Sequence, residues 1–187
     1  MTSADNLLAI IDELAHDATL IDGAQLDKLS DLILDADRVF VAGAGRSGFA
    51  ARAFANRLMH IGRTVFFVGE PTTPALQRDD VLIIGSGSGE TASLVSMARK
   101  ARELGARVAT LTIFPENTIG ALSEVVVVIP GVTSKVDSAN EKASSIQTPG
   151  SSFEQLSWLI YDAIVIALRQ RLYLSDADLY GRHANLE

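Results

Sequence analysis

The fold is decided by one stretch of the chain, Val81-Leu82-Ile83-Ile84-Gly85-Ser86-Gly87-Ser88-Gly89-Glu90-Thr91, which leads into a helical pattern over residues 91–104. Its continuous apolar start predicts a strand buried in a parallel sheet, and its glycines let the backbone approach a ligand closely. A helix that begins here presents unpaired N–H groups and the positive end of its dipole. Uncharged hydroxyl donors come from Ser86, Ser88 and Thr91. The stretch therefore predicts a cradle for a phosphate monoester.

A plainer interpretation of the same stretch is structural. Ser88 would then only cap the following helix, while Gly87 and Gly89 would only form a tight turn. A second glycine-rich loop earlier in the chain favours the phosphate interpretation.

Composition limits the class of protein. The 187 residues suit one domain with a sizeable core, and the absence of cysteine argues against disulfides and thiolate chemistry. A net charge of -7 disfavours nucleic acid, which attracts clustered Lys and Arg. No apolar run reaches the ~18 residues of a membrane span, and the start of the chain lacks the basic segment of a signal peptide. We expect an unprocessed cytoplasmic protein that binds neither nucleic acid nor membrane.

The order of strand and helix patterns predicts an α/β fold. Five apolar runs alternate with helical patterns, and Gly62 and Gly105 end two of the helices as left-handed caps. Such a chain forms a parallel sheet covered on both faces, here a flavodoxin-like three-layer α-β-α sandwich. The predicted strands are 39–42, 64–68, 81–84, 108–112 and 125–129. The predicted helices are an N-terminal pair, 4–18 and 25–34, then 47–61, 91–104, 118–122 and a long C-terminal helix, 152–172.

We expect a single domain over residues 1–187, with N-terminal helices (1–36), a parallel α/β core (37–130), a polar loop that acts as a lid (131–150), and a C-terminal helix and tail (151–187). The last helix is apolar around nearly its whole circumference, so we expect it to pack against another subunit as well as against the sheet. The tail after residue 172 is polar and non-periodic.

The other glycine-rich loop is Gly43-Ala44-Gly45-Arg46-Ser47-Gly48, between a predicted strand and a predicted helix. It matches the G-x-G-x-x-G pattern of dinucleotide-binding folds, and Glu70 stands near the position of a ribose-binding carboxylate. Arg46 and Ser47 suit a phosphate monoester equally well, and a pyrophosphate would need no second phosphate loop. We therefore favour substrate binding by Gly45, Arg46 and Ser47, with the dinucleotide as an alternative.

Together, the two loops resemble the sugar isomerase (SIS) domain family. Its signature pairs a G-x-G-x-S-G loop, here 43–48, with an S-x-S-G-x-T loop, here 86–91, and the match runs from about residue 38 to the C-terminus. Within this family, the segments QTPGSSFEQ (147–155) and RHANLE (182–187) are similar to the 6-phospho-3-hexuloisomerases.

The resemblance implies an SIS-type fold and a reaction between D-arabino-hex-3-ulose 6-phosphate and D-fructose 6-phosphate. It places the protein in the ribulose monophosphate pathway of formaldehyde fixation, with 3-hexulose-6-phosphate synthase as pathway partner. It also implies a homo-oligomer, as a rule a tetramer, and no cofactor.

The chemistry of this reaction needs a base. A ketone moves from C3 to C2 when one group takes a proton from C2 and returns it to C3 through an enediolate. Glu154 suits the role because it follows a Pro-Gly turn, beside Phe153, at the start of a buried helix. The run Ser151-Ser152-Phe153-Glu154 is also an S-x-x-E capping box, in which the glutamate would only bond its own helix. The residue pattern leaves both interpretations open, and the resemblance favours the base.

Histidine supplies the remaining candidates. His183, in the tail, can assist ring opening or move protons between the sugar oxygens, and in SIS isomerases a C-terminal histidine often reaches a neighbouring subunit's site. His60 can contact substrate or only complement the end of its helix. The histidines are widely separated in sequence, so we expect no metal site.

The sequence thus predicts a metal-free ketose phosphate isomerase, with Glu154 as base, assisted by His183, and phosphate held by both loops. Two alternatives remain open: an arabinose 5-phosphate or heptose phosphate isomerase, and a sugar phosphate sensor without catalysis.

Overall fold

A parallel sheet forms the centre of the molecule. The structure, a computed structural model, describes residues 2–133 and 145–186. The five strands are β1 (Val39–Gly43), β2 (Val65–Phe67), β3 (Val81–Gly85), β4 (Arg107–Thr112) and β5 (Val125–Val128), in the order β2-β1-β3-β4-β5. All neighbouring pairs are parallel. From β1 the chain adds β2 on one side of the sheet, and it then adds β3, β4 and β5 in the opposite direction. The place between β1 and β3 is therefore the topological switch point, and open α/β sheets bind ligands there, at the carboxyl ends of their strands.

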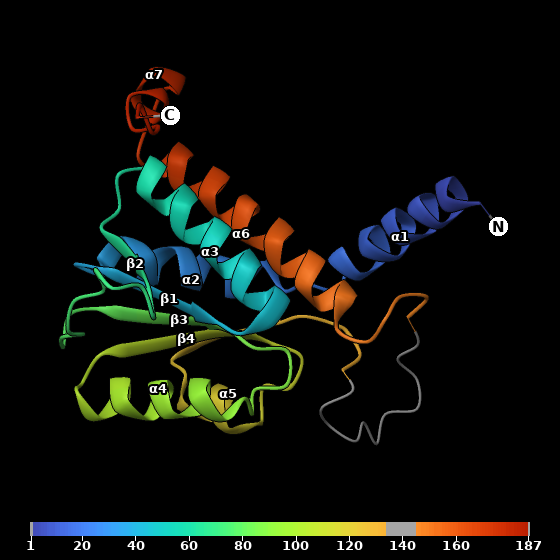
Figure 1. Ribbon diagram of the computed structural model, residues 1–187, viewed down its shortest axis with the longest axis horizontal. Coiled ribbons are helices and arrows are strands. Elements are labelled where there is room, and N and C mark those ends of the chain that lie inside the picture. Colours follow the sequence, from blue (N-terminus) through green and yellow to red (C-terminus); the bar gives the residue numbers. More distant parts are fainter. Residues whose placement is uncertain (1, 134–144, 187) are drawn as a thin grey trace.

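Helices cover both faces of the sheet (Figure 1), which confirms the predicted three-layer sandwich. One face packs on α2 (Gly23–Asp35), α3 (Gly45–His60) and α6 (Ser151–Arg171). The other packs on α4 (Ala92–Glu103) and α5 (Thr118–Leu122). Successive residues of β1 alternate between the two cores, because strand side chains point to opposite faces. Gly62 and Gly105 follow α3 and α4 with positive φ, as expected of left-handed caps.

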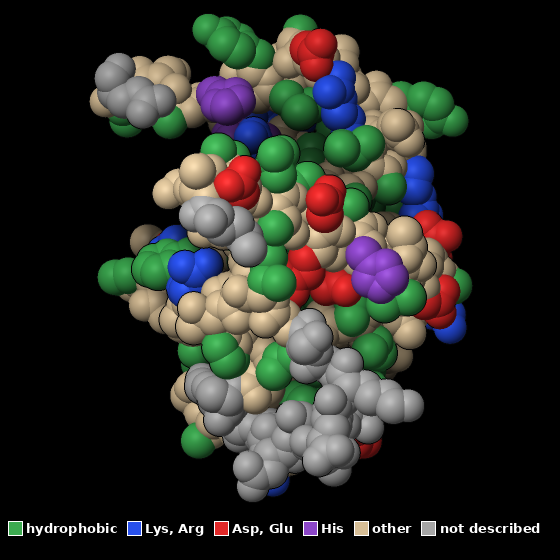
Figure 2. Space-filling model, turned by 90° about the vertical axis from the view of Figure 1, so that its right-hand side faces the viewer, with side chains coloured by type: hydrophobic (Ala, Val, Ile, Leu, Met, Phe, Trp, Pro, Cys, Tyr) green, Lys and Arg blue, Asp and Glu red, His purple; other side chains and the backbone are tan. Residues whose placement is uncertain are grey.

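The two ends of the chain differ from the sheet region in their packing. α1 (Ser3–Ala18) projects from the sandwich, has no buried residue and leaves Leu7, Leu8 and Ile11 at least half exposed. Figure 2 looks onto the side from which α1 projects and shows hydrophobic side chains among acidic ones. The polar, non-periodic tail contains a further short helix, which was not predicted from the sequence: α7 (Asp176–Tyr180) begins with a capping box formed by Ser175 and Asp178.

Two further expectations concern segments that bear on function. Residues 134–144, most of the expected lid, lie outside the described residues. Most apolar residues of α6 are buried, but Trp158, Leu159 and Ile166 are 46%, 53% and 58% exposed within one chain. Among the described helices, none has the length and apolar character needed to cross a membrane.

Candidate active site

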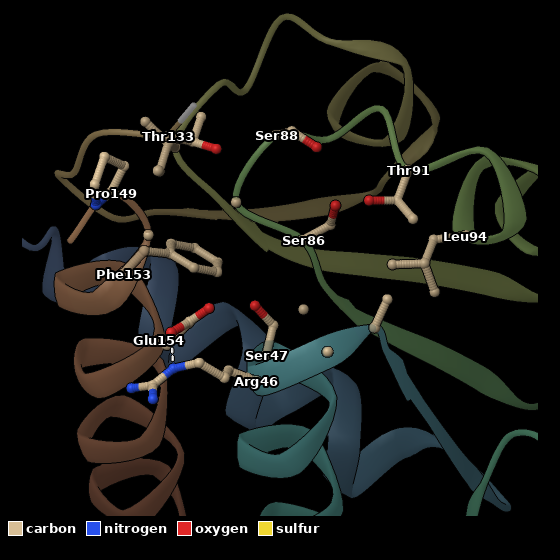
Figure 3. Close-up of a pocket in the computed structure, with 16 residues that line it drawn as sticks. Arg46, Ser47, Ser86, Ser88, Thr91, Leu94, Thr133, Pro149, Phe153 and Glu154 are labelled. Atoms are coloured by element: carbon tan, nitrogen blue, oxygen red, sulfur yellow. Dashed lines mark hydrogen bonds and ion pairs between the residues drawn. The ribbon is translucent and has the colours of Figure 1, made fainter. Parts of the chain in front are cut away.

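The loops after β1 and β3 enclose a cavity of about 180 Å³ (Figure 3). Gly43 and Gly85 are register partners, so both glycine-rich loops leave the sheet at the same point. The cavity is smaller than the ~300–1,000 Å³ typical of pockets for drug-sized ligands, and a small phosphorylated metabolite suits it better. Its lining residues are Ala44, Gly45, Arg46, Ser47, Gly85, Ser86, Gly87, Ser88, Thr91, Leu94, Ile113, Thr133, Pro149, Gly150, Phe153 and Glu154.

The first turns of three helices line this cavity. The N-cap residues are Ala44 for α3, Thr91 for α4 and Gly150 for α6, and within the described chain no side chain caps any of them. An uncapped helix start leaves backbone N–H groups without intrahelical partners, next to the positive end of the dipole. The cavity is therefore suited to an anion.

The predicted phosphate loop adds hydroxyl groups to this environment. The Ser86 hydroxyl is buried and has no hydrogen-bond partner among residues 2–133 and 145–186. A buried polar group of this kind calls for a ligand or water. Ser88 Oγ accepts a hydrogen bond from the Glu90 amide at 3.3 Å, and α4 starts only after Thr91. The interpretation of Ser88 as a simple helix cap is therefore wrong.

Glycine is required at two places in this loop. Gly89 has a φ of +64°, a left-handed conformation that other residues adopt only with strain. At Gly87, a Cβ would lie 3.2 Å from the ring of Phe153, so a side chain there would need this ring to shift by a few tenths of an ångström. The loop is thus tightly packed against the start of α6.

Glu154 faces the cavity from α6, opposite the phosphate loop (Figure 3). Its side chain is 20% exposed, and its carboxylate accepts a charge-assisted hydrogen bond from Nε of Arg46, which is 65% exposed. The helix begins at Ser151 with Gly150 as N-cap, and the Glu154 carboxylate bonds Arg46. The capping-box interpretation of Glu154 is therefore wrong. Arg46, expected to contact the ligand, is engaged with the candidate base.

Glu70, the residue that supported the dinucleotide alternative, forms an ion pair with Arg52. Its carboxylate accepts a hydrogen bond from Arg52, whose guanidinium lies 4.1 Å from the centre of the Phe67 ring. The occupied carboxylate and the second phosphate loop both disfavour a bound dinucleotide.

The two histidine candidates lie together but away from the cavity. The rings of His60 and His183 stack with their centres 4.1 Å apart, at the carboxyl end of α3. The cavity is at the amino end of this 16-residue helix, and such a helix is ~24 Å long. Burial lowers the pKa of His60, and the positive charges of His183 and Arg57 lower it further. Within one chain, neither histidine meets Glu154.

Sequence reasoning missed several cavity residues. Ile113 follows β4, Leu94 lies in the first turn of α4, and Thr133 follows β5. The rule that ligands bind at the carboxyl ends of parallel strands could have identified Ile113 and Thr133. In the described chain, no three His, Asp or Glu side chains gather as metal ligands would.

The fold and the site define a doubly wound α/β protein with a cavity suited to an anion at its switch point. The chain belongs to the SIS domain family, which its residues 32–158 match, as the two loops predicted.

Relatives are similar to this chain over nearly their whole length. A Bacillus subtilis protein named 3-hexulose-6-phosphate isomerase is 43% identical over 100% of both chains. A Mycobacterium gastri protein of the same name is 40% identical over 98% of this chain and 90% of its own. A solved structure from Methanococcus jannaschii, described as inferring a 3-hexulose-6-phosphate isomerase function, has a TM-score of 0.78 at 30% identity, covering 98% of this chain and 96% of its own.

Proposed function

We propose that this protein interconverts D-arabino-hex-3-ulose 6-phosphate and D-fructose 6-phosphate. The names of the 43% and 40% identical relatives support the substrate pair. The observation that carries the chemistry is the placement of Glu154 across the cavity from Ser86 and Ser88. One wall suits the phosphate, and the opposite wall presents a carboxylate to the sugar.

The phosphate group binds at the first turns of α3 and α4. Ser47, Ser86, Ser88 and Thr91 supply hydroxyl donors, and the backbone N–H groups from Gly45 onward and around Gly87 supply the rest. Gly89 shapes the loop and does not line the cavity, because its N–H donates to the Ser86 carbonyl oxygen. Hydrogen bonds to a charged group stabilise binding by about 1.5–3 kcal/mol each, so a few are enough to anchor a small sugar phosphate. The anchored phosphate directs the open-chain sugar toward α6.

Proton transfer is carried out by Glu154. Its carboxylate takes the proton from C2 of the 3-ketose, the C–H electron pair forms the C2=C3 bond, and the C3 oxygen becomes the enediolate oxygen. The C2 hydroxyl proton then passes to the C3 oxygen, the C2=C3 electron pair takes up the proton of the carboxyl at C3, and C2 becomes the new ketone, which leaves the carboxylate ionised again. The step uses no external oxidant and needs no metal. Arg46 holds the carboxylate in position through its hydrogen bond.

The chain acts as a homo-oligomer, as a rule a tetramer. A groove lined by Leu7, Ile10, Ile11 and Leu14 of α1, Phe49 of α3, and Trp158 and Leu159 of α6 is almost wholly apolar. A second copy of the chain covers it, as the half-exposed apolar residues of α6 suggest. Arg46 and Glu154 also line this groove, so the interface adjoins the active site.

In the oligomer, His183 acts in the active site of a neighbouring copy. Since His183 lies far from the Glu154 of its own chain, it serves the site of a neighbouring copy and moves protons between the sugar oxygens, with His60 packed against it. The substrate comes from 3-hexulose-6-phosphate synthase in the ribulose monophosphate pathway.

Deuterium incorporation tests the reaction. The protein is incubated in D2O with fructose 6-phosphate, and the position of the label is read by NMR. Deuterium at C3 supports a 2,3-enediolate, whereas deuterium at C1 alone would indicate an aldose–ketose isomerase instead. Parallel incubation with arabinose 5-phosphate examines the related alternative. Exchange with none of these sugars, despite binding, would favour the sensor.

A further inference from the structure

Tyr161 lies beneath the cavity without lining it. The residue belongs to α6 and is 2% exposed, and its ring stacks on Phe54 of α3 with centroids 4.3 Å apart and planes 12° apart. Its hydroxyl oxygen faces Gly85, where a Cβ would come within 3.0 Å of it. Gly85 lines the cavity, so the phenol lies next to a residue of the cavity wall.

The hydroxyl of Tyr161 is buried and, in the part of the chain that the structure describes, has no hydrogen-bond partner. Such a group lowers the stability of the fold, and a phenylalanine would make the same ring stack without it. Burial raises the pKa of Tyr161, so the phenol stays neutral at physiological pH. The neutral hydroxyl therefore affects the structure through its volume, which fills the space next to Gly85.

Three elements that supply site residues meet at this contact. β3 ends at Gly85 and continues into Ser86, the start of α3 carries Ser47, and α6 carries Glu154. Glu154 precedes Tyr161 by seven residues, which places it two turns, or ~10 Å, earlier on the same face of the helix. Phe153 makes the second contact between α6 and the loop, at Gly87.

We propose that Tyr161 is a positioning residue whose phenolic oxygen acts as a spacer between α6 and the Gly85 end of β3. It sets the distance from the phosphate-binding loop to the Glu154 carboxylate, and it takes no part in proton transfer. The inference rests on the proposed function, because it concerns where the base meets a sugar anchored by its phosphate.

The spacer predicts a specific kinetic signature for Tyr161→Phe. Without the oxygen, α6 settles closer to β3, and a displacement of about 1 Å at a reacting centre lowers turnover up to ~100-fold. We expect kcat to fall by about 10- to 100-fold. KM for fructose 6-phosphate and the inhibition constant of inorganic phosphate should stay within about twofold, because the phosphate donors are unchanged. The melting temperature should stay the same or rise, because an unpaired buried hydroxyl is removed.

A second substitution separates a spacer from a hydrogen-bonding role. Gly85→Ala alone places a methyl group 3.0 Å from the hydroxyl and should lower kcat by forcing the two elements apart. In the Tyr161→Phe background the methyl extends from Gly85 toward the space left by the oxygen and fills part of the gap between the two elements, so the double variant should recover kcat to within about threefold of wild type. Tyr173→Phe, at a tyrosine that is 93% exposed, is the matched control and should leave kcat and melting temperature unchanged.

The outcomes are distinct. The spacer is supported by a drop in kcat at constant KM, with a melting temperature that is unchanged or higher and with recovery of kcat in the double variant. It is overturned by unchanged kcat in Tyr161→Phe, by a lower melting temperature, by a rise in KM alone, or by failure of Gly85→Ala to restore turnover. Wild-type protein that does not exchange deuterium at C3 would instead overturn the proposed function.

Discussion

Gly43 of β1 and Gly85 of β3 stand opposite each other in the sheet as register partners. The two glycine-rich loops, which are far apart in the sequence, therefore leave the sheet side by side at the switch point. One loop leads into α3 and the other into α4, so two uncapped helix starts converge on one cavity. Substitutions in and around that cavity should separate phosphate binding from proton transfer.

Glu154→Gln should abolish most of the turnover while leaving binding intact. General-base catalysis contributes about 10²–10⁴-fold, so we expect kcat for the hexulose phosphate to fall by at least 100-fold. Phosphate affinity should change little, because the donors lie on the opposite wall. Glu103→Gln, on the exposed surface of α4, is the matched control. Turnover within severalfold of wild type would remove Glu154 from the role.

Ser86→Ala should weaken substrate binding without destabilising the protein. Loss of a hydrogen bond to phosphate should raise KM by about 10-fold or more. Because the Ser86 hydroxyl has no partner in the described chain, the melting temperature should not fall. The control is Ser96→Ala, at an exposed serine of α4. An unchanged KM for Ser86→Ala would show that phosphate binds elsewhere.

Complementation tests whether His183 serves a neighbouring copy. Glu154→Gln and His183→Ala chains should each be nearly inactive alone. Mixed by refolding together, they should regain activity, because some sites then combine an intact Glu154 with an intact His183 from another copy. Mixtures that remain as inactive as the two separate variants would contradict a shared site.

Trp158→Glu should disrupt the oligomer. The side chain is 46% exposed in the apolar groove, and a charge there would be buried in any interface that covers it. Light scattering at micromolar concentration should show a smaller species with reduced activity. Leu104→Glu, a substitution of similarly exposed apolar surface after α4, should leave the oligomer intact. Wild-type protein that is monomeric at this concentration would contradict the proposal.

The pH dependence of stability should report the burial of His60. Its folded-state pKa is lowered, so the folded protein binds fewer protons than the unfolded chain in this range. Stability is therefore complete above the unfolded pKa of ~6.5 and decreases as the pH falls through the folded pKa. We expect the melting temperature to fall between about pH 7.5 and about pH 5.5, and His60→Leu to reduce that fall. His16→Gln, on exposed α1, should not; an equal pH dependence in His60→Leu would contradict the assignment.

The sequence predicted those parts of the structure that depend on short local patterns of residues. Apolar runs and glycines predicted the five strands and the two glycine-rich turns between strand and helix, because burial and left-handed backbone leave clear local signals. Phosphate binding by these turns stays a prediction. The tail helix was missed although Ser175 and Asp178 form a capping box, a signal that was present in the sequence.

Contacts between side chains that are far apart in the sequence could not be predicted from it. The Arg46 and Glu154 side chains are 108 residues apart, and nothing local in either motif indicates that one bonds the other. The stacking of His60 on His183 likewise depends on how the tail returns to α3. Tyr161 was not singled out from the sequence, because its position next to Gly85 results from the packing of α6 on β3 and leaves no local signal.

The most direct test of the central claim is a crystal structure of the protein with bound fructose 6-phosphate. The phosphate should accept hydrogen bonds from Ser86 and Ser88 and from the first turns of α3 and α4, with C2 and C3 within about 3 Å of a Glu154 carboxylate oxygen. A phosphate bound away from these loops, or a sugar whose C2 and C3 are remote from Glu154, would contradict the claim.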